Sequence, residues 1–599
     1  MTVREDLRAA LARGVEAESS IAAHAALRVL DPLLCFIARR RLRKLLERTR
    51  RVTIEDLPAH RLRVAALLLA PATPELDFDD QEAVLQAFSA LGPMPGPRPS
   101  GPWFTLGSIV SLALVGAAVA LTARWLQPFD PRLSVEGRVL GGELSTFVVK
   151  TSNGVTGSAL NETRVQLTGP LAERALGADT VKALAELLDA AGWVAAAKPL
   201  GQGSPEIERF HNAGNALAVL LSRRKLPYFV DVDTLHQSER TLPLLMSFYV
   251  ERESEYRAGS ERVRTLDLWR LDTLRVRFGA LGYTRPRTPA ALVLLDQVES
   301  DLVRTLLPAV APGEPVQLVD DETREQRLPW ANALERVAGE AVRKHFAALS
   351  SDPHVIEVGR LLAKRRALVR RWRATVADGG HLLRVPERLI PEANYSSDLH
   401  LRVANSELYD WDDLHGELMS KQNYAAFLRL REPYVLGIER HEVEHRLDYA
   451  RGFRPLPTLV CHLLGIDNPL DAPVGSMQER VNAEFSAYLA QLVEAPDSPV
   501  LELIVLSTHL LDARTGGGVY WYAALGVLSA VANELGLNPE QVVGRRAPRE
   551  RVATLLTQLI ARDPKELRAA AAHAYEHAYG EPVPHALKQV THENAAWRH

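Results

Sequence analysis

Hydrophobic and polar positions along the chain predict a mostly helical protein with a smaller part that contains strands. Apolar residues recur at helical spacing in residues 178–191, 328–376, 500–511 and 519–535. Alternating or β-branched runs predict strands at residues 146–151, 228–233 and 263–269. The pattern therefore favours a mostly α fold with a smaller α+β part.

Residues 103–123 form an apolar run without a single charged side chain. As a helix this run would be roughly 30 Å long, which is enough to cross the hydrocarbon core of a membrane. Trp103 and Trp125 flank it, as aromatic side chains do at membrane interfaces. We expect a single transmembrane helix over residues 102–125, with the lipid bilayer as a partner through residues 103–123. A buried helix of a soluble domain is the alternative.

The apolar run divides the chain into regions. Before it, residues 1–101 are Arg-rich, helical in pattern and end in a linker of Pro and Gly. Because this region opens without a hydrophobic signal peptide, we expect it to stay in the cytoplasm and the C-terminal part to lie in a periplasm, with the protein single-pass in a bacterial inner membrane. After the run we expect a mixed α/β region at residues 126–330 and a second, helical domain at residues 331–599.

The composition excludes only a few classes of function. A net charge of -3 with 24% charged residues is ordinary for a globular protein and indicates no nucleic-acid partner. Only ten of the 71 basic residues are lysine, which favours a GC-rich bacterial genome. The two cysteines, Cys35 and Cys461, cannot form a disulfide framework. The sequence leaves the oligomeric state unknown.

The candidate chemistry lies in one predicted helix. Pro433 is tolerated in a first helical turn, and no breaker stronger than Gly437 follows until Gly452, so we expect a helix of about four to five turns. On that helix His441 and His445 lie on one face, one turn apart. This is the spacing of two imidazoles that share one metal ion.

A third ligand must come from elsewhere in the chain. Glu442 completes the pattern His-Glu-x-x-His, in which the glutamate stays outside the metal shell and acts as general base on a bound water. A catalytic zinc ion takes three protein ligands and keeps one position open. The helix predicted at residues 478–489 offers Glu479 and Glu484, of which we favour Glu484. The expected cofactor is Zn2+.

The motif with Asp448 three residues after it, followed by a helix reading Glu-Phe-x-Ala, resembles the gluzincin metallopeptidases. Within them it is similar to the branch of lethal-factor-like and proline-directed endopeptidases. The resemblance covers residues 433–489. It implies zinc ligands His441, His445 and Glu484, a general base Glu442, and a helical, zinc-peptidase-like C-terminal domain. This chain departs from the family in having Tyr488 where a further acidic residue is usual.

Three further roles are expected around the motif. Asp448, one turn beyond His445, could accept a ligand imidazole N–H, with an ordinary exposed acid as the alternative. A tyrosine in the aromatic run at residues 520–522 could donate to an oxyanion, although core packing also explains that run. Short strands predicted at residues 381–385 and 400–403 offer an edge that could pair with an extended peptide substrate.

Two other groups compete as metal sites. The inverted motif His-x-x-Glu-His spans residues 573–577, with Glu581 and Glu593 as candidate third ligands. Asp231 and Asp233 form a carboxylate pair, but the rest of a calcium loop is missing, and alternation on a half-buried strand explains them better.

The sequence leads us to expect a membrane-anchored zinc metallopeptidase that cleaves a peptide or protein substrate, with its metallopeptidase-like domain at residues 331–599. Two alternatives stay open. One is a non-catalytic, membrane-anchored scaffold or envelope-complex protein whose motif is accidental or retired. The other keeps the metal but hydrolyses amide bonds in cell-wall material.

Overall fold

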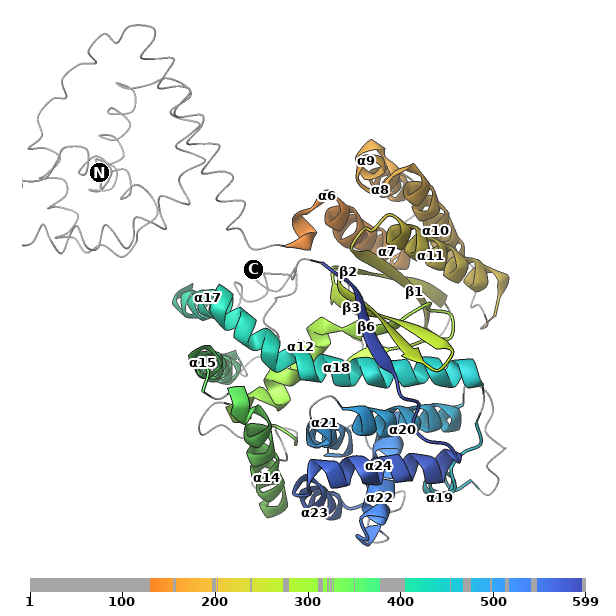
Figure 1. The fold of residues 1–599 in the computed structure, drawn as a ribbon. Coiled ribbons are helices and arrows are strands. Elements are labelled where there is room, and N and C mark those ends of the chain that lie inside the picture. Colours follow the sequence, from red (N-terminus) through yellow and green to blue (C-terminus); the bar gives the residue numbers. More distant parts are fainter. Residues whose placement is uncertain are drawn as a thin grey trace, which may run out of the picture. The chain divides into compact units, whose positions relative to one another are not determined.

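The computed structural model describes residues 130–599, apart from a set of short segments. These segments are residues 155–157, 197–200, 202, 238–239, 273–279, 311–315, 320–322, 324–325, 327, 350, 377–404, 453, 467–475, 496–497, 512–516, 540–546 and 595–599. Helices make up most of the described part, and one six-stranded sheet lies among them (Figure 1). One compact unit, Pro128–His599, contains all of it. The regions predicted on either side of residue 330 therefore share this unit.

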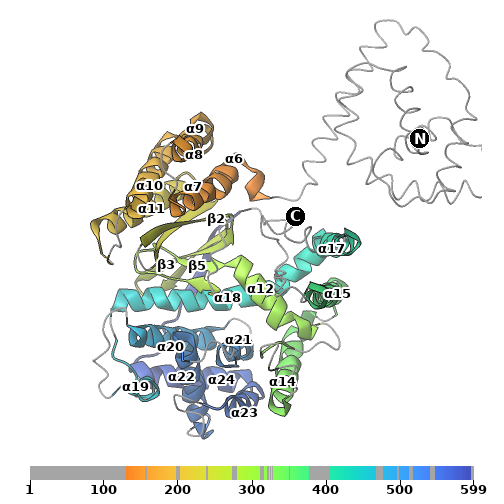
Figure 2. The ribbon, with the colours of Figure 1, turned by 180° about the vertical axis from the view of Figure 1, so that it is seen from behind.

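Helices from the first part of the described chain cover one face of the sheet (Figures 1 and 2). They are α6 (Val135–Gly137), α7 (Leu144–Ser152), α8 (Ser158–Thr168), α9 (Pro170–Leu176), α10 (Ala178–Ala196) and α11 (Pro205–Arg223), with the short helices η2 (Pro131–Leu133) and η3 (Arg138–Glu143). Helix α10 buries Leu184, Leu187 and Val194, and it packs against β2. The strand predicted at residues 146–151 is wrong, because those residues belong to α7, where buried Phe147 outweighs the β-branched local preference.

The sheet has the strand order β1-β2-β3-β5-β4, and β6 pairs with β2. The strands are β1 (Tyr228–Gln237), β2 (Arg240–Ala258), β3 (Glu261–Arg270), β4 (Gly282–Tyr283), β5 (Ala291–Leu294) and β6 (Leu587–Glu593). Only β3 and β5 run parallel among these pairs. The strand predictions at residues 228–233 and 263–269 are confirmed. The last strand comes from the far end of the chain and lies along β2 (Figure 1).

Side chains bridge the two end strands of this order, β1 and β4, so the sheet curves. The Tyr283 hydroxyl donates to Asp231 at 2.7 Å. Arg285 pairs with Asp231 at 3.0 Å and with Asp233 at 2.9 Å. Both aspartates therefore bind a guanidinium. Residues 228–232 of β1 are all buried, so the expected alternation on a half-buried strand is wrong. The bridge also fixes the segment after β4, which reaches the candidate site.

The long helix α18 (Lys421–Arg451) lies between the sheet and the C-terminal helices (Figures 1 and 2). It packs against β3 and β5 on one side and against α20 on the other. The remaining helices are α12 (Leu295–Thr305), η4 (Leu307–Val310), α14 (Pro329–His345), η5 (Phe346–Leu349), α15 (Pro353–Val376), α17 (Asn405–Leu418), α19 (Thr458–Leu464), α20 (Met477–Glu494), α21 (Pro499–Leu511), α22 (Val519–Glu534), α23 (Arg549–Ile560) and α24 (Pro564–Tyr579). The helical segments predicted at residues 178–191, 500–511 and 519–535 are confirmed, and the segment predicted at residues 328–376 is divided among α14, η5 and α15.

The predicted start of the motif helix is wrong, whereas its end is right. Helix α18 begins at Lys421 after the N-cap residue Ser420, so Pro433 lies inside it. A proline removes one helical hydrogen bond, but packing on both sides of α18 compensates for that loss. The helix ends at Gly452, whose φ of 81° is a conformation that favours glycine.

Paired charges, rather than apolar side chains alone, join α18 to the sheet. Glu439 of α18 is fully buried, and it accepts hydrogen bonds from Tyr256 at 2.6 Å and from Lys588 of β6 at 2.6 Å. Arg252 of β2 pairs with Asp267 at 2.7 Å and with Glu439 at 3.4 Å. We call these five residues the central ion-pair cluster. Because each buried charge has an opposite partner, its desolvation is offset.

The fold-class prediction of a transmembrane helix plus a helical C-terminal domain is wrong. No helix in the described part of the chain is long and apolar enough to cross a membrane. The sheet, which was expected to belong to a separate region, packs directly on α18. Its strands are dispersed from residue 228 to residue 593, and such long-range pairing leaves no local signal. The span predicted at residues 102–125, the region 1–101 and the strands predicted at 381–385 and 400–403 lie outside the described residues.

Replacing Lys588 by Met tests the central ion-pair cluster. The substitution removes a cation from the buried Glu439 carboxylate, and we expect the free energy of unfolding to fall by about 1–3 kcal/mol in chemical denaturation. Lys565→Met is the matched control, because Lys565 is exposed at the start of α24. Equal stability of the two variants would contradict the structural role of Lys588.

Candidate metal centre

Helix α18 presents the motif residues toward two different neighbours. His441 and His445 are 7% exposed and lie one turn apart, and the Nε2 atoms of the two rings are 3.1 Å apart. Glu442 is 4% exposed and lies toward the segment that follows β4. Burial in the interior of the unit therefore holds all three side chains in place.

Helix α20 supplies the third side chain of the group. Ser476 caps this helix by accepting from the Glu479 N–H at 3.2 Å. Two turns of α20 then bring Glu484 opposite the imidazoles, with Oε2 at 3.2 Å from His441 Nε2 and Oε1 at 3.7 Å from His445 Nε2. His441, His445 and Glu484 offer one ligand atom each within 4.8 Å of one another, and they form the one such group in the described part of the chain. We call them the ligand group.

The hydrogen bonds around His441 show that the ligand group suits a cation. Gln491 donates through Nε2 to Glu502, so its Oε1 is the atom that faces His441 Nδ1 at 3.1 Å. That oxygen only accepts, and Nδ1 therefore carries the hydrogen. In neutral His441 the Nε2 lone pair then points at a carboxylate oxygen and a second imidazole nitrogen. Three electron-pair donors thus converge: Nε2 of His441, Nε2 of His445 and a Glu484 carboxylate oxygen. They repel one another unless a proton or a metal ion lies between them. Two imidazoles and one carboxylate are a common set of zinc ligands.

Electrostatics within the ligand group favour a positive charge. Burial opposes the charged form of His445, but the Glu484 carboxylate outweighs it and raises the pKa of His445 from 6.5 to about 9. Burial likewise opposes ionisation of Glu484, yet the His445 and His441 imidazoles hold the pKa of Glu484 well below its usual range. Glu484 is therefore a carboxylate near neutral pH.

The segment that follows β4 holds Glu442 beside the two histidines. The Thr284 hydroxyl donates to Glu442 Oε2 at 2.8 Å, and it also lies 3.2 Å from the Glu442 carbonyl oxygen. Gly282 of β4 has no side chain, and a Cβ there would lie 2.9 Å from Glu442 Oε1. Burial raises the pKa of Glu442, while the two imidazoles and the Thr284 hydrogen bond act in the other direction. The carboxylate is thus fixed in orientation and is more basic than an exposed glutamate.

Asp448 lies one turn beyond His445 and binds other groups. Its Oδ2 accepts from Ser486 of α20, and its Oδ1 accepts from Arg454. Burial and the neighbouring Glu444 raise the pKa of Asp448 to about 6. Asp448 therefore ties α18 to α20 beside the ligand group, and the expected contact with a ligand imidazole stays a prediction.

A row of aromatic rings runs from the ligand group toward α22. The ring of Tyr488 is tilted against that of His441 with the ring centroids 4.6 Å apart, and the His509 ring lies 6.2 Å from that of Tyr488. Tyr520 continues the row at 5.4 Å from His509 and is 42% exposed. Its neighbour Trp521 is buried in the core. Of the aromatic run at residues 520–522, Tyr520 is thus the residue that reaches the site.

The remaining sequence candidates do not join the ligand group. Glu479, the alternative third ligand, lies in the first turn of α20. In the inverted motif on α24, the side chains of His573 and His577 are 66% and 75% exposed, and His577 Nδ1 binds Glu534 at 2.7 Å. Glu581 instead binds Arg454 at 3.4 Å. Glu593 lies on β6.

Sequence reasoning missed Gln491 and Thr284. Gln491 lies seven residues after Glu484 and so faces the same side of α20, but the helix was predicted only to residue 489. Extending the pattern by one turn would have found it. Thr284 follows a strand of two residues, and no local signal connects it with a helix that lies 158 residues further along the chain.

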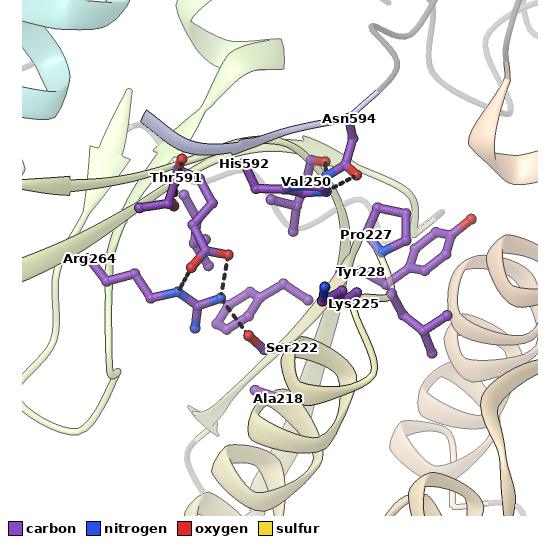
Figure 3. A pocket seen from close by; sticks show the side chains of 14 residues that line it. Ala218, Ser222, Lys225, Pro227, Tyr228, Val250, Arg264, Thr591, His592 and Asn594 are labelled. Atoms are coloured by element: carbon purple, nitrogen blue, oxygen red, sulfur yellow. Dashed lines mark hydrogen bonds and ion pairs between the residues drawn. The ribbon is translucent and has the colours of Figure 1, made fainter. Parts of the chain in front are cut away.

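A separate cavity of about 300 Å³ lies on the α11 side of the sheet, bordered by β2, β3 and β6 (Figure 3). Arg264 inside it binds Glu253 at 2.7 Å and Ser222 at 3.0 Å. The cavity shares no residue with the ligand group.

Comparison with known proteins adds no relative, since no protein-family model, curated protein or solved structure matches this chain. The gluzincin resemblance is therefore not tested by any relative. The geometry of the ligand group and its neighbours is therefore the evidence for function.

The raised pKa of His445 predicts a pH dependence in the metal-free protein. Protonated His445 stabilises the fold fully below its unfolded pKa of 6.5, and this contribution is lost as the pH rises toward about 9. We expect the thermal midpoint of chelator-treated protein to fall over this range, by the equivalent of roughly 3 kcal/mol at most. The control is His445→Gln, which lacks the titrating ring. Parallel declines in the two proteins would contradict the assignment.

Proposed function

We propose that the protein is a zinc-dependent peptidase. One observation carries the proposal: the two motif histidines and Glu484 converge within 4.8 Å, while the motif glutamate is held beside them by Thr284. An accidental His-Glu-x-x-His on a helix surface would have no reason to face a third ligand on a helix more than thirty residues further along the chain. The donor set has two imidazole nitrogens and one carboxylate oxygen, which is a catalytic zinc set that leaves a position open.

In this proposal His441, His445 and Glu484 hold the zinc ion. When bound, zinc would supply a Lewis acid for the peptide carbonyl and lower the pKa of a water molecule. The chain itself supplies the proton transfers. Glu442 takes a proton from the attacking water and donates it to the leaving amine nitrogen. Burial raises the pKa of Glu442 and makes it a stronger base than an exposed glutamate. The Thr284 hydroxyl keeps its carboxylate in one orientation.

Tyr520 is our candidate for the donor that stabilises the oxyanion. It is partly exposed at the end of the aromatic row that begins at His441. Burial, then the negative charges of Glu484 and Glu442, raise its pKa, so the hydroxyl keeps its proton. A donor that bonds to charge developing in the transition state contributes to kcat more than to binding.

The test of the peptidase proposal is hydrolysis of a quenched fluorescent casein by the full-length protein loaded with zinc. We expect Glu442→Gln to keep the metal and to lose nearly all activity, about 10²- to 10⁴-fold, because a general base is removed. Glu479→Gln is the matched control on the neighbouring helix, and its activity should equal that of the wild type. Purified peptidoglycan is assayed in parallel.

The outcome of this assay distinguishes a peptidase from a cell-wall amidase and from a non-catalytic scaffold. Cleavage of casein that depends on Glu442 supports a peptidase, whereas Glu442-dependent release from peptidoglycan alone would assign amide cleavage in cell-wall material. A zinc-loaded protein that hydrolyses neither substrate would overturn the enzyme proposal and favour a non-catalytic scaffold.

Replacing Tyr520 by Phe tests its role as the oxyanion donor. The variant loses one hydroxyl, and we expect kcat to fall about 10²-fold with little change in KM. Tyr522→Phe on the same helix is the control, since Tyr522 packs against the core. A fall in both variants, or in neither, would refute this role.

A further inference from the structure

A chain of three buried side chains leads from the ligand group into the protein interior. His441 Nδ1 donates to Gln491 Oε1 at 3.1 Å, and Gln491 Nε2 donates to Glu502 Oε2. Gln491 is 3% exposed and Glu502 is 6% exposed. Water therefore screens little of the Glu502 charge along this path.

The directions of the two hydrogen bonds follow from the chemistry of the groups. A carboxylate only accepts, so the Gln491 amide must turn its NH2 toward Glu502 and its oxygen toward the imidazole. The negative charge polarises the amide, and the amide oxygen then accepts more strongly from His441 Nδ1–H. Electron density shifts toward Nε2, which is the nitrogen that faces Glu484 and His445.

Gly437 accounts for how Glu502 reaches this position. It lies on α18 one turn before His441, and a Cβ there would lie 2.1 Å from Glu502 Oε1 and 2.8 Å from its Cδ. No side chain larger than hydrogen fits without moving that carboxylate. Glycine inside a helix costs about 1 kcal/mol relative to alanine. Glycine is found at position 437 because the Glu502 carboxylate occupies the space that a Cβ would need.

We propose that Gln491 and Glu502 form a relay that orients His441 and strengthens its Nε2 as a metal ligand, and that Gly437 is glycine to admit Glu502. The relay rests on the proposed metal centre. In many metal sites a carboxylate accepts a hydrogen bond directly from a metal-binding histidine. Here the Gln491 amide lies between the Glu502 carboxylate and His441. Gln491 and Glu502 are positioning residues, because they act through His441.

The test measures zinc affinity of the full-length protein by competition with a chromophoric chelator, together with the thermal midpoint of each chelator-treated variant. Glu502→Gln keeps the shape and a hydrogen bond but removes the charge, and Gln491→Leu removes both bonds. Gly437→Ala displaces Glu502. We expect each substitution to weaken zinc binding about 10- to 100-fold. The double variant Gln491→Leu with Glu502→Gln should bind no more weakly than the weaker single variant, because the two residues act in series.

Gly192→Ala is the matched control for Gly437→Ala, since Gly192 also lies in a helix and a Cβ there meets nothing within 4 Å. It should leave zinc affinity unchanged. Unchanged affinity in Gln491→Leu and Glu502→Gln, with stoichiometric zinc in the wild type, would overturn the relay and leave the metal centre standing. A wild type that binds no zinc would overturn both. Should Glu502→Gln fail to fold, Gln491→Leu and Gly437→Ala decide the question.

Discussion

The structure depends on the burial of a charged helix. Helix α18 lies between the sheet and the C-terminal helices, and both of its sides carry ionisable groups that are almost excluded from water. Burying such charges is unfavourable unless each finds a partner. On the sheet side Glu439 has Arg252, Tyr256 and Lys588. On the other side His441 and His445 face Glu484, and Gln491 and Glu502 lie behind His441.

This constraint links the fold to the site. The sheet curves until Tyr283 reaches Asp231, and the same segment places Thr284 against Glu442. Helix α20 places Glu484, Tyr488 and Gln491 on one side, where each contacts the motif histidines. The motif therefore lies where two independent layers meet, one of which orients the proposed base and the other the proposed ligands. A buried arrangement of this kind is costly to maintain, and a metal ion would offset that cost.

Local patterns in the sequence anticipated several of the helices, such as α10, α21 and α22, and two of the strands, because apolar periodicity determines which side of an element is buried. Spacing along a helix also anticipated that His441 and His445 share one side, and the family resemblance favoured Glu484 over Glu479. The start of α18 was missed because Pro433 was placed in a first helical turn, whereas it lies inside the helix. The pairing of β6 with β2, the Thr284 contact and the place of Glu502 depend on long-range packing. Gly437 was noticed only as a helix breaker, and its purpose became clear from the carboxylate beside it.

The central claim is that His441, His445 and Glu484 bind one zinc ion. The most direct measurement is zinc-edge anomalous diffraction from crystals of the full-length protein grown with zinc. We expect a single strong peak about 2.0–2.2 Å from Nε2 of both histidines and from a Glu484 carboxylate oxygen. Density for three well-ordered side chains with no peak between them, or a peak only at exposed histidines such as His573 and His577, would contradict it.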